Sequence, residues 1–186
     1  GVIEWPARIK TPLVSQLNSV TSDILPTLCE LVGIDLPSRE LDGISLMRTF
    51  DGALEQRSVP IFFWQYNVAA DKQREPWISG PLQIGTTPLV KMMGNVYTRT
   101  FKNFKHPEIV ASDFGGSRVV LADDYKLVVA GNAGMIKAQL FKVPQDVAEK
   151  NDIAAGNPEV VQSMLEQLRK WQTSVLTSLT GAEYKP

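Results

Sequence analysis

The sequence predicts an α+β fold: a small four-stranded antiparallel sheet packed by a long C-terminal helix and preceded by a strand and a helix. Three strand-like runs separated by two tight turns lie within residues 118–143, which is typical of an antiparallel meander. A fourth run, at residues 59–66, is rich in β-branched and aromatic residues and can extend the sheet. The open face of this sheet needs cover, and the apolar stripe of the last helix can supply it.

The first elements are a short strand and an amphipathic helix. Residues 1–5 are typical of a strand that the following proline ends. A helix is expected to begin near Ser22, capped by Thr21 or Ser22 with Asp23 at the positive end of its dipole, and to stop at Gly33. Its apolar residues recur at steps of three and four and predict one face that packs in a core. These residues are Ile24, Leu25, Leu28, Leu31 and Val32.

The middle of the chain shows weaker patterns. Residues 35–52 are polar and rich in turn-forming residues, so they predict a surface linker with a short helical turn at residues 45–49. The strand at residues 59–66 follows. Residues 67–116 have no clear period and are expected to form a long ordered excursion, with a short helix at residues 88–93.

The last third of the chain carries the clearest signals. Strands are predicted at residues 118–122, 125–130 and 139–143, with turns between them. Asn157 and Pro158 then mark the start of the long helix, since asparagine caps and proline suits the first helical position. Its apolar stripe consists of Val161, Met164, Leu165, Leu168, Trp171, Val175 and Leu179.

Composition limits the classes of function. The 186 residues suffice for one domain or two small ones, and 19 basic against 20 acidic residues leave a net charge of −1. This balance argues against binding to nucleic acid or to an anionic membrane surface. No run of apolar residues is long enough for a membrane span, and no signal peptide is recognised. A strand expected at the very first residues favours a chain cut from a longer one.

Six segments, in order along the chain, match a known pattern. They are Val-Ile-Glu-Trp-Pro-Ala-Arg-Ile at 2–9, Asp-x-x-Pro-Thr from 23 with Gly33, Asp-Gly-x-Ser-Leu from 42 with Gly52, Asp-Tyr-Lys-Leu-Val at 124–128, Leu-Phe-Lys-Val from 140 with the acidic and amide residues up to 151, and the ending at 171–184. Together they resemble the C-terminal part of the sulfatases, which are arylsulfatase-like members of the alkaline-phosphatase-like superfamily and hydrolyse sulfate esters. Residues 67–117 are poorly covered by the resemblance.

The resemblance implies an organisation and a function. Residues 1–52 would be the tail of the α/β alkaline-phosphatase-like catalytic domain with its linker, the strand and helix being its remnant, and residues 53–186 the sulfatase C-terminal subdomain. The full-length form would hydrolyse sulfate esters of carbohydrates or aryl groups, in the periplasm or outside the cell. This chain would be structural or substrate-shaping, and inactive alone.

The resemblance also implies which cofactors belong elsewhere. Sulfatases use a formylglycine made from a Cys/Ser-x-Pro/Ala-x-Arg motif and a calcium ion held by several Asp and Asn or Gln side chains, and both are expected upstream. Cys29 does not match that motif and is expected to be a core residue. The single histidine, His106, cannot build a base and metal site, and its simpler interpretation is a hydrogen-bonded loop residue. No catalytic residue, metal ligand or cofactor is therefore predicted in this chain.

Substrate contacts are the remaining site hypothesis. Arginine can pair with an anionic sugar through two parallel hydrogen bonds, and an aromatic ring can stack on a sugar ring. The simpler interpretations are that Trp64 belongs to the core and that Arg99 is solvated. The candidates are Trp64, Gln65, Trp77, Arg99, His106 and Arg118.

Three kinds of partner follow from these interpretations. The expected one is the missing N-terminal catalytic region of the same protein. A free-standing module that binds sulfated or other anionic glycans is an alternative. The third is self-assembly, because the strand and helix of residues 1–33 would present an unpaired edge and an apolar face to another copy.

Overall fold

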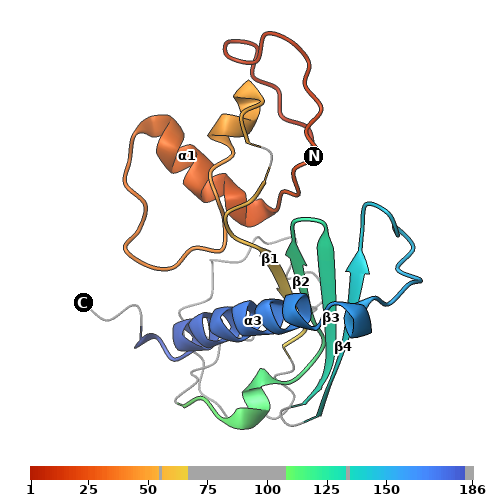
Figure 1. Cartoon of the computed structure of the whole chain (residues 1–186). Helices are drawn as coiled ribbons and strands as arrows, with labels where there is room; N and C mark the ends of the chain where they lie inside the picture. Colours follow the sequence, from red (N-terminus) through yellow and green to blue (C-terminus); the bar gives the residue numbers. More distant parts are fainter. Residues whose placement is uncertain (55, 67–107, 133–134, 183–186) are drawn as a thin grey trace, which may run out of the picture.

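The computed structural model describes residues 1–54, 56–66, 108–132 and 135–182. Figure 1 shows a sheet with a long helix across it, and an N-terminal part that stands above them. Most of the predicted excursion at residues 67–116, including the helix expected at 88–93, lies outside the described residues. Its described end contains a short 3₁₀ turn, η5 (Ala111–Phe114).

The sheet has the four antiparallel strands that the sequence predicts. They are β1 (Ile61–Trp64), β2 (Arg118–Ala122), β3 (Tyr125–Asn132) and β4 (Met135–Lys142), in the spatial order β1-β2-β3-β4. The β3–β4 hairpin is longer than expected, because the ladder continues to the pair Asn132 and Met135. Gly131 makes this possible: its φ is +98°, and a Cβ there would lie 2.2 Å from the Met135 carbonyl oxygen.

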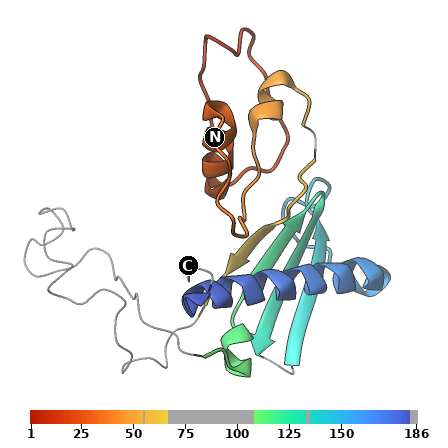
Figure 2. The same cartoon turned by 90° about the vertical axis from the view of Figure 1, so that its left-hand side faces the viewer.

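Helix α3 (Pro158–Leu179) covers one face of the sheet, as Figure 2 shows from the side. Side chains that alternate along the strands point toward it and form the core with two residues of the helix. This core consists of Val120, Leu127, Val129, Leu140, Met164 and Leu168. The predicted packing of the C-terminal helix on the sheet is therefore confirmed.

The buried line of α3 departs from the predicted stripe at its end. Its buried residues are Met164, Leu168, Gln172 and Leu176, whereas the sequence pattern favoured Val175 and Leu179. These buried residues are four positions apart, and residues spaced in this way follow a line that winds slowly around the helix. The line of contact with the sheet therefore leaves the predicted apolar stripe toward the end of α3. Gln172 is accommodated because its Nε2 donates to the Phe114 carbonyl oxygen at 3.3 Å.

The N-terminal part contains α1 (Ile24–Val32), entered through the 3₁₀ turn η1 (Thr21–Asp23). Gly33 ends α1 in the left-handed region at φ +69°, as predicted. The short helical turn expected at residues 45–49 is the 3₁₀ helix η2 (Met47–Asp51).

Three expectations for this part need correction. The strand predicted at residues 1–5 is not formed, because no described strand lies beside it to complete its hydrogen bonds. The predicted apolar face of α1 is exposed, and the buried residues are Asp23, Pro26 and Thr27. Neither Thr21 nor Ser22 caps α1: the residue at the N-cap position is Asp23, and its Oδ2 accepts the Val20 N–H at 2.8 Å.

Candidate functional site

A hollow of about 460 Å³ lies at the end of the sheet where β1 leads out and β2 begins. Its walls come from the segment after β1, from η5 and the glycines that follow it, and from the end of β3. The lining residues are Tyr66, Ala111, Ser112, Asp113, Gly115, Gly116 and Asn132. Hydroxyl, carboxylate, amide and backbone groups are thus gathered in one place.

Close backbone approach shapes this hollow. Gln65 N–H donates to the Ser117 carbonyl oxygen at 2.8 Å, which holds the segment after β1 against the start of β2. Gly116 has φ +95°, and a Cβ there would lie 2.4 Å from the Gln65 carbonyl oxygen. A Cβ on Gly115 would lie 2.6 Å from Asn132 Oδ1. Only glycine fits at position 116 without moving the wall.

Hydrogen bonds hold the polar groups of the hollow in position. The Tyr66 hydroxyl donates to Asp113 Oδ1 at 3.2 Å, and Asp113 Oδ2 accepts the Val110 N–H at 2.8 Å. The Tyr66 ring packs edge-on against Trp64, with ring centroids 4.9 Å apart. The indole Nε1–H of Trp64 in turn donates to the Gly115 carbonyl oxygen at 2.7 Å. The walls are therefore preorganised by packed aromatic rings.

The predicted contact residues divide into three groups. Trp64 supports the wall of the hollow from behind, and Gln65 is exposed beside it. Trp77, Arg99 and His106 lie outside the described residues.

Arg118 is buried below the hollow and contacts two of its wall segments. Its Nη1–H donates to the Phe114 carbonyl oxygen and its Nη2–H to that of Gly131 at 2.8 Å. Burial, and then the charge of Arg169, lower the pKa of the Arg118 guanidinium. The contacts of Arg118 with a substrate remain a prediction, whereas its described contacts position η5 against β3.

Sequence reasoning missed Tyr66, Asp113 and Asn132. The signal that could have pointed to Tyr66 and Asp113 is the pair Gly115-Gly116 shortly before a β-rich run, because adjacent glycines there indicate close backbone approach. Asn132 could not be found in this way, since its place depends on how far the β3–β4 hairpin extends.

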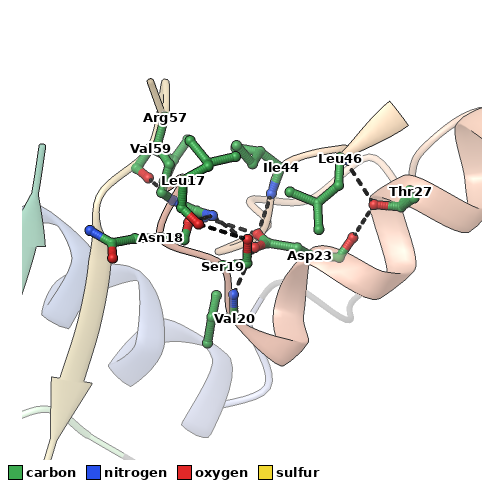
Figure 3. A network of polar contacts seen from close by, with 10 residues as sticks. All are labelled: Leu17, Asn18, Ser19, Val20, Asp23, Thr27, Ile44, Leu46, Arg57 and Val59. Atoms are coloured by element: carbon green, nitrogen blue, oxygen red, sulfur yellow. Dashed lines mark hydrogen bonds and ion pairs between the residues drawn. The ribbon is translucent and has the colours of Figure 1, made fainter. Parts of the chain in front are cut away.

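A second polar network holds the N-terminal part together (Figure 3). Asp23 is fully buried, and its carboxylate accepts hydrogen bonds from both terminal nitrogens of Arg57, at 2.7 and 2.9 Å. Its carboxylate also accepts the backbone N–H groups of Val20 and Ile44 at 2.8 and 2.9 Å. Burial alone would raise the pKa of Asp23, but these hydrogen bonds outweigh it and lower the pKa.

The rest of this network ties α1 to the segment before η2. Thr27 Oγ1 donates to the Asp23 carbonyl oxygen at 2.6 Å and accepts the Leu46 N–H at 2.9 Å. Arg57 also donates to the carbonyl oxygens of Val59 and Asn18, at 2.9 and 3.1 Å. Since the carboxylate already accepts four hydrogen bonds, this network fits a structural role better than ligand binding.

The described residues hold neither a metal-binding cluster nor a membrane-spanning helix. Among them, no group of three or more His, Cys, Asp or Glu side chains could hold a metal ion. None of the described helices is long and apolar enough to cross a membrane. A second hollow, of about 640 Å³, lies between residues 38–40 and α3, and is lined by polar residues that are exposed or half-buried.

Comparison with known proteins relates the chain to one group of enzymes. No protein-family model matches it. It is 26% identical over 175 residues to arylsulfatase K of Xenopus laevis. The match covers 91% of this chain and 26% of that protein. The chain therefore spans about a quarter of the length of this relative.

A solved structure shares the fold. The crystal structure of yidJ from Bacteroides fragilis, a protein assigned to the sulfatases, matches with a TM-score of 0.55 and 16% identity over 95% of this chain and 30% of that one. The α+β arrangement of sheet and C-terminal helix, together with the sequence match, shows that this chain is homologous to a part of the sulfatases.

Proposed function

We propose that this chain is the C-terminal part of a sulfatase and that its polar hollow contacts the alcohol portion of a sulfate ester. The observation that supports this most is the match over 91% of the chain to an arylsulfatase of which it spans 26%. In this proposal residues 1–52 complete the catalytic domain and residues 53–186 form the C-terminal subdomain. The reacting groups lie in the remaining three quarters of the enzyme.

The chemistry of the hollow favours the alcohol portion over the sulfate. Tyr66 and Asn132 offer groups that both donate and accept hydrogen bonds, as sugar hydroxyls do. Asp113 is a carboxyl group whose oxygens already accept hydrogen bonds from Tyr66 and Val110, and such oxygens suit the hydroxyl donors of a sugar. A carbohydrate therefore fits the hollow better than a small aryl group.

The cofactors and the location belong to the same proposal. Calcium and a formylglycine would be held by the remainder of the enzyme, and the whole protein would be periplasmic or secreted. Both statements follow from the resemblance to sulfatases, and they are to be tested in the full-length protein.

A kinetic comparison in the full-length enzyme tests the role of the hollow. Asn132→Ala removes one amide from the wall, so the KM for a sulfated oligosaccharide is expected to rise about tenfold, as the loss of about 1.4 kcal/mol implies. The KM for a small aryl sulfate should stay unchanged, because its alcohol portion does not extend to the hollow. Lys137→Ala, at an exposed position on the neighbouring strand, is the control. Equal KM values in all three proteins would contradict substrate contact.

A second assay tests whether the chain lacks the reacting groups. Residues 1–186 alone are expected not to hydrolyse an aryl sulfate, with or without calcium. Turnover that survives repurification would contradict the proposal.

A free-standing glycan-binding module is the alternative function. It is favoured by the fact that the described walls of the hollow bring several polar groups of this chain together. Titration of residues 1–186 with a heparin oligosaccharide separates the two functions. Micromolar affinity that Asn132→Ala weakens would favour the free-standing module. Millimolar or weaker affinity would favour a hollow that binds carbohydrate only together with the rest of the enzyme.

A further inference from the structure

Helix α1 presents an apolar face to solvent. Five of its residues are between 41% and 62% exposed. At about 100° per residue they all fall within an arc of about 120°. They are Ile24, Leu25, Leu28, Leu31 and Val32, and we refer to them as the α1 face. Glu30 is the only charged residue of the helix, and its position lies outside this arc. A contiguous uncharged surface of this kind is typical of an interaction site.

The polar network prevents α1 from turning this face inward. Asp23 and Thr27 lie on the other side of the helix and are buried against Arg57 and Leu46 (Figure 3). Rolling the helix would expose those groups and leave the buried Arg57 charge without its partner, which is strongly destabilising. Figures 1 and 2 both place α1 in the N-terminal part, away from the sheet and α3. The face is therefore held outward by the chain's own structure.

We propose that the α1 face is the interface on which the rest of the sulfatase chain packs. This inference rests on the proposed function. The fold match to yidJ covers 95% of this chain but only 30% of that one, so most of such an enzyme lies outside the present chain and can cover the face. An uncharged arc fits permanent burial better than a transient contact, since permanent interfaces resemble a domain core. Arg57 and Asp23 act as positioning residues that aim the face.

Co-expression of two polypeptides tests this interface. One is residues 1–186, and the other is the remainder of the full-length gene product, carrying an affinity tag. The wild-type chain should copurify with the tagged partner, and Leu28→Glu with Leu31→Glu should reduce the recovered amount at least tenfold. Val147→Glu is the matched control, because Val147 is an apolar residue that is 81% exposed on a loop outside the α1 face. Circular dichroism and urea unfolding of each variant alone should match the wild type, since both leucines are already exposed.

The outcomes separate this inference from the proposed function. Recovery that depends on Leu28 and Leu31 supports the interface, even when the recovered complex has no sulfatase activity and the proposed function fails. An active complex whose recovery the double substitution leaves unchanged overturns the interface and leaves the function standing. Sedimentation provides the last test: a stable dimer of residues 1–186 that the double substitution dissociates, and that the tagged partner cannot displace, would overturn the inference in favour of a second copy.

Discussion

Asp23 is the residue on which the N-terminal part depends most. Its carboxylate is buried with the Arg57 guanidinium and also accepts two backbone N–H groups. A buried pair contributes little compared with an apolar replacement, but removal of one member leaves an uncompensated charge. The contribution of Asp23 to the stability of the chain is therefore measured better by replacing the residue than by counting its hydrogen bonds.

Asp23→Asn should destabilise the chain by about 3 kcal/mol, because the Arg57 charge stays buried without its counterion. Urea unfolding followed by circular dichroism measures this change. Asp51→Asn is the control: it breaks the ion pair with Arg8 at 2.6 Å, whose side chains are 37% and 55% exposed, and should cost less than about 1 kcal/mol. Equal losses in both variants would contradict a special role for the buried pair.

The same carboxylate predicts a pH dependence of stability. The pKa of Asp23 is lowered in the folded state, so the unfolded chain takes up the proton first as the pH falls. Its stabilising contribution is present above the unfolded pKa of about 3.9 and is lost as the pH falls through the folded value. The difference in free energy of unfolding between wild type and Asp23→Asn should therefore shrink below about pH 4. Asp146 and Asp152 also have lowered pKa values, and they cancel in this difference.

At the scale of elements, the turn from η5 into β2 carries the strictest backbone requirement. Gly116→Ala should destabilise the chain by about 1–3 kcal/mol, because alanine is strained at φ +95° and its Cβ would meet the Gln65 carbonyl oxygen. Gly156→Ala is the control, since nothing lies within 4 Å of its Cβ position. Thermal unfolding compares the two. An equal effect at both positions would show that the wall between β1 and β2 can relax.

The sequence predicted the elements well where a local signal exists. The strand bounds 118–122 and the end of α1 at Gly33 agree with the structure, because turn residues and glycine act on their immediate neighbours. The buried line of α3 was only partly predicted. Gln172 is buried by a hydrogen bond to Phe114, which is distant in sequence and leaves no local trace.

At the scale of the whole molecule, the two parts are expected to differ in local stability. The sheet and α3 share a continuous apolar core, whereas α1 has a largely exposed face. Amide hydrogen exchange should therefore be faster in α1 than in β3, since local opening of α1 exposes little new apolar surface. Equal protection in the isolated chain would contradict this. Addition of the remainder of the enzyme should slow exchange in α1 and leave β3 unchanged.

The candidate site illustrates what a sequence leaves undecided. The sequence predicts Trp64 and Arg118 as substrate contacts. In the structure neither is among the residues that line the hollow, and both donate hydrogen bonds to backbone carbonyl groups of the segments around it. Tyr66, Asp113 and Asn132, which do line it, come from separate segments that meet only when the sheet forms. Trp77, Arg99 and His106 lie outside the described residues, and their role stays a prediction.

The sequence by itself determined the α+β class, the four-stranded sheet, the long helix and the likeness to sulfatases, because strand, turn and helix periodicities and short motifs are local properties. Only the tertiary structure decided which face of α1 is buried. A periodic pattern shows that a helix has an apolar side, but what that side contacts depends on the atoms available around it. In this chain the Asp23–Arg57 pair occupies the inner side, and the apolar side is left for a partner.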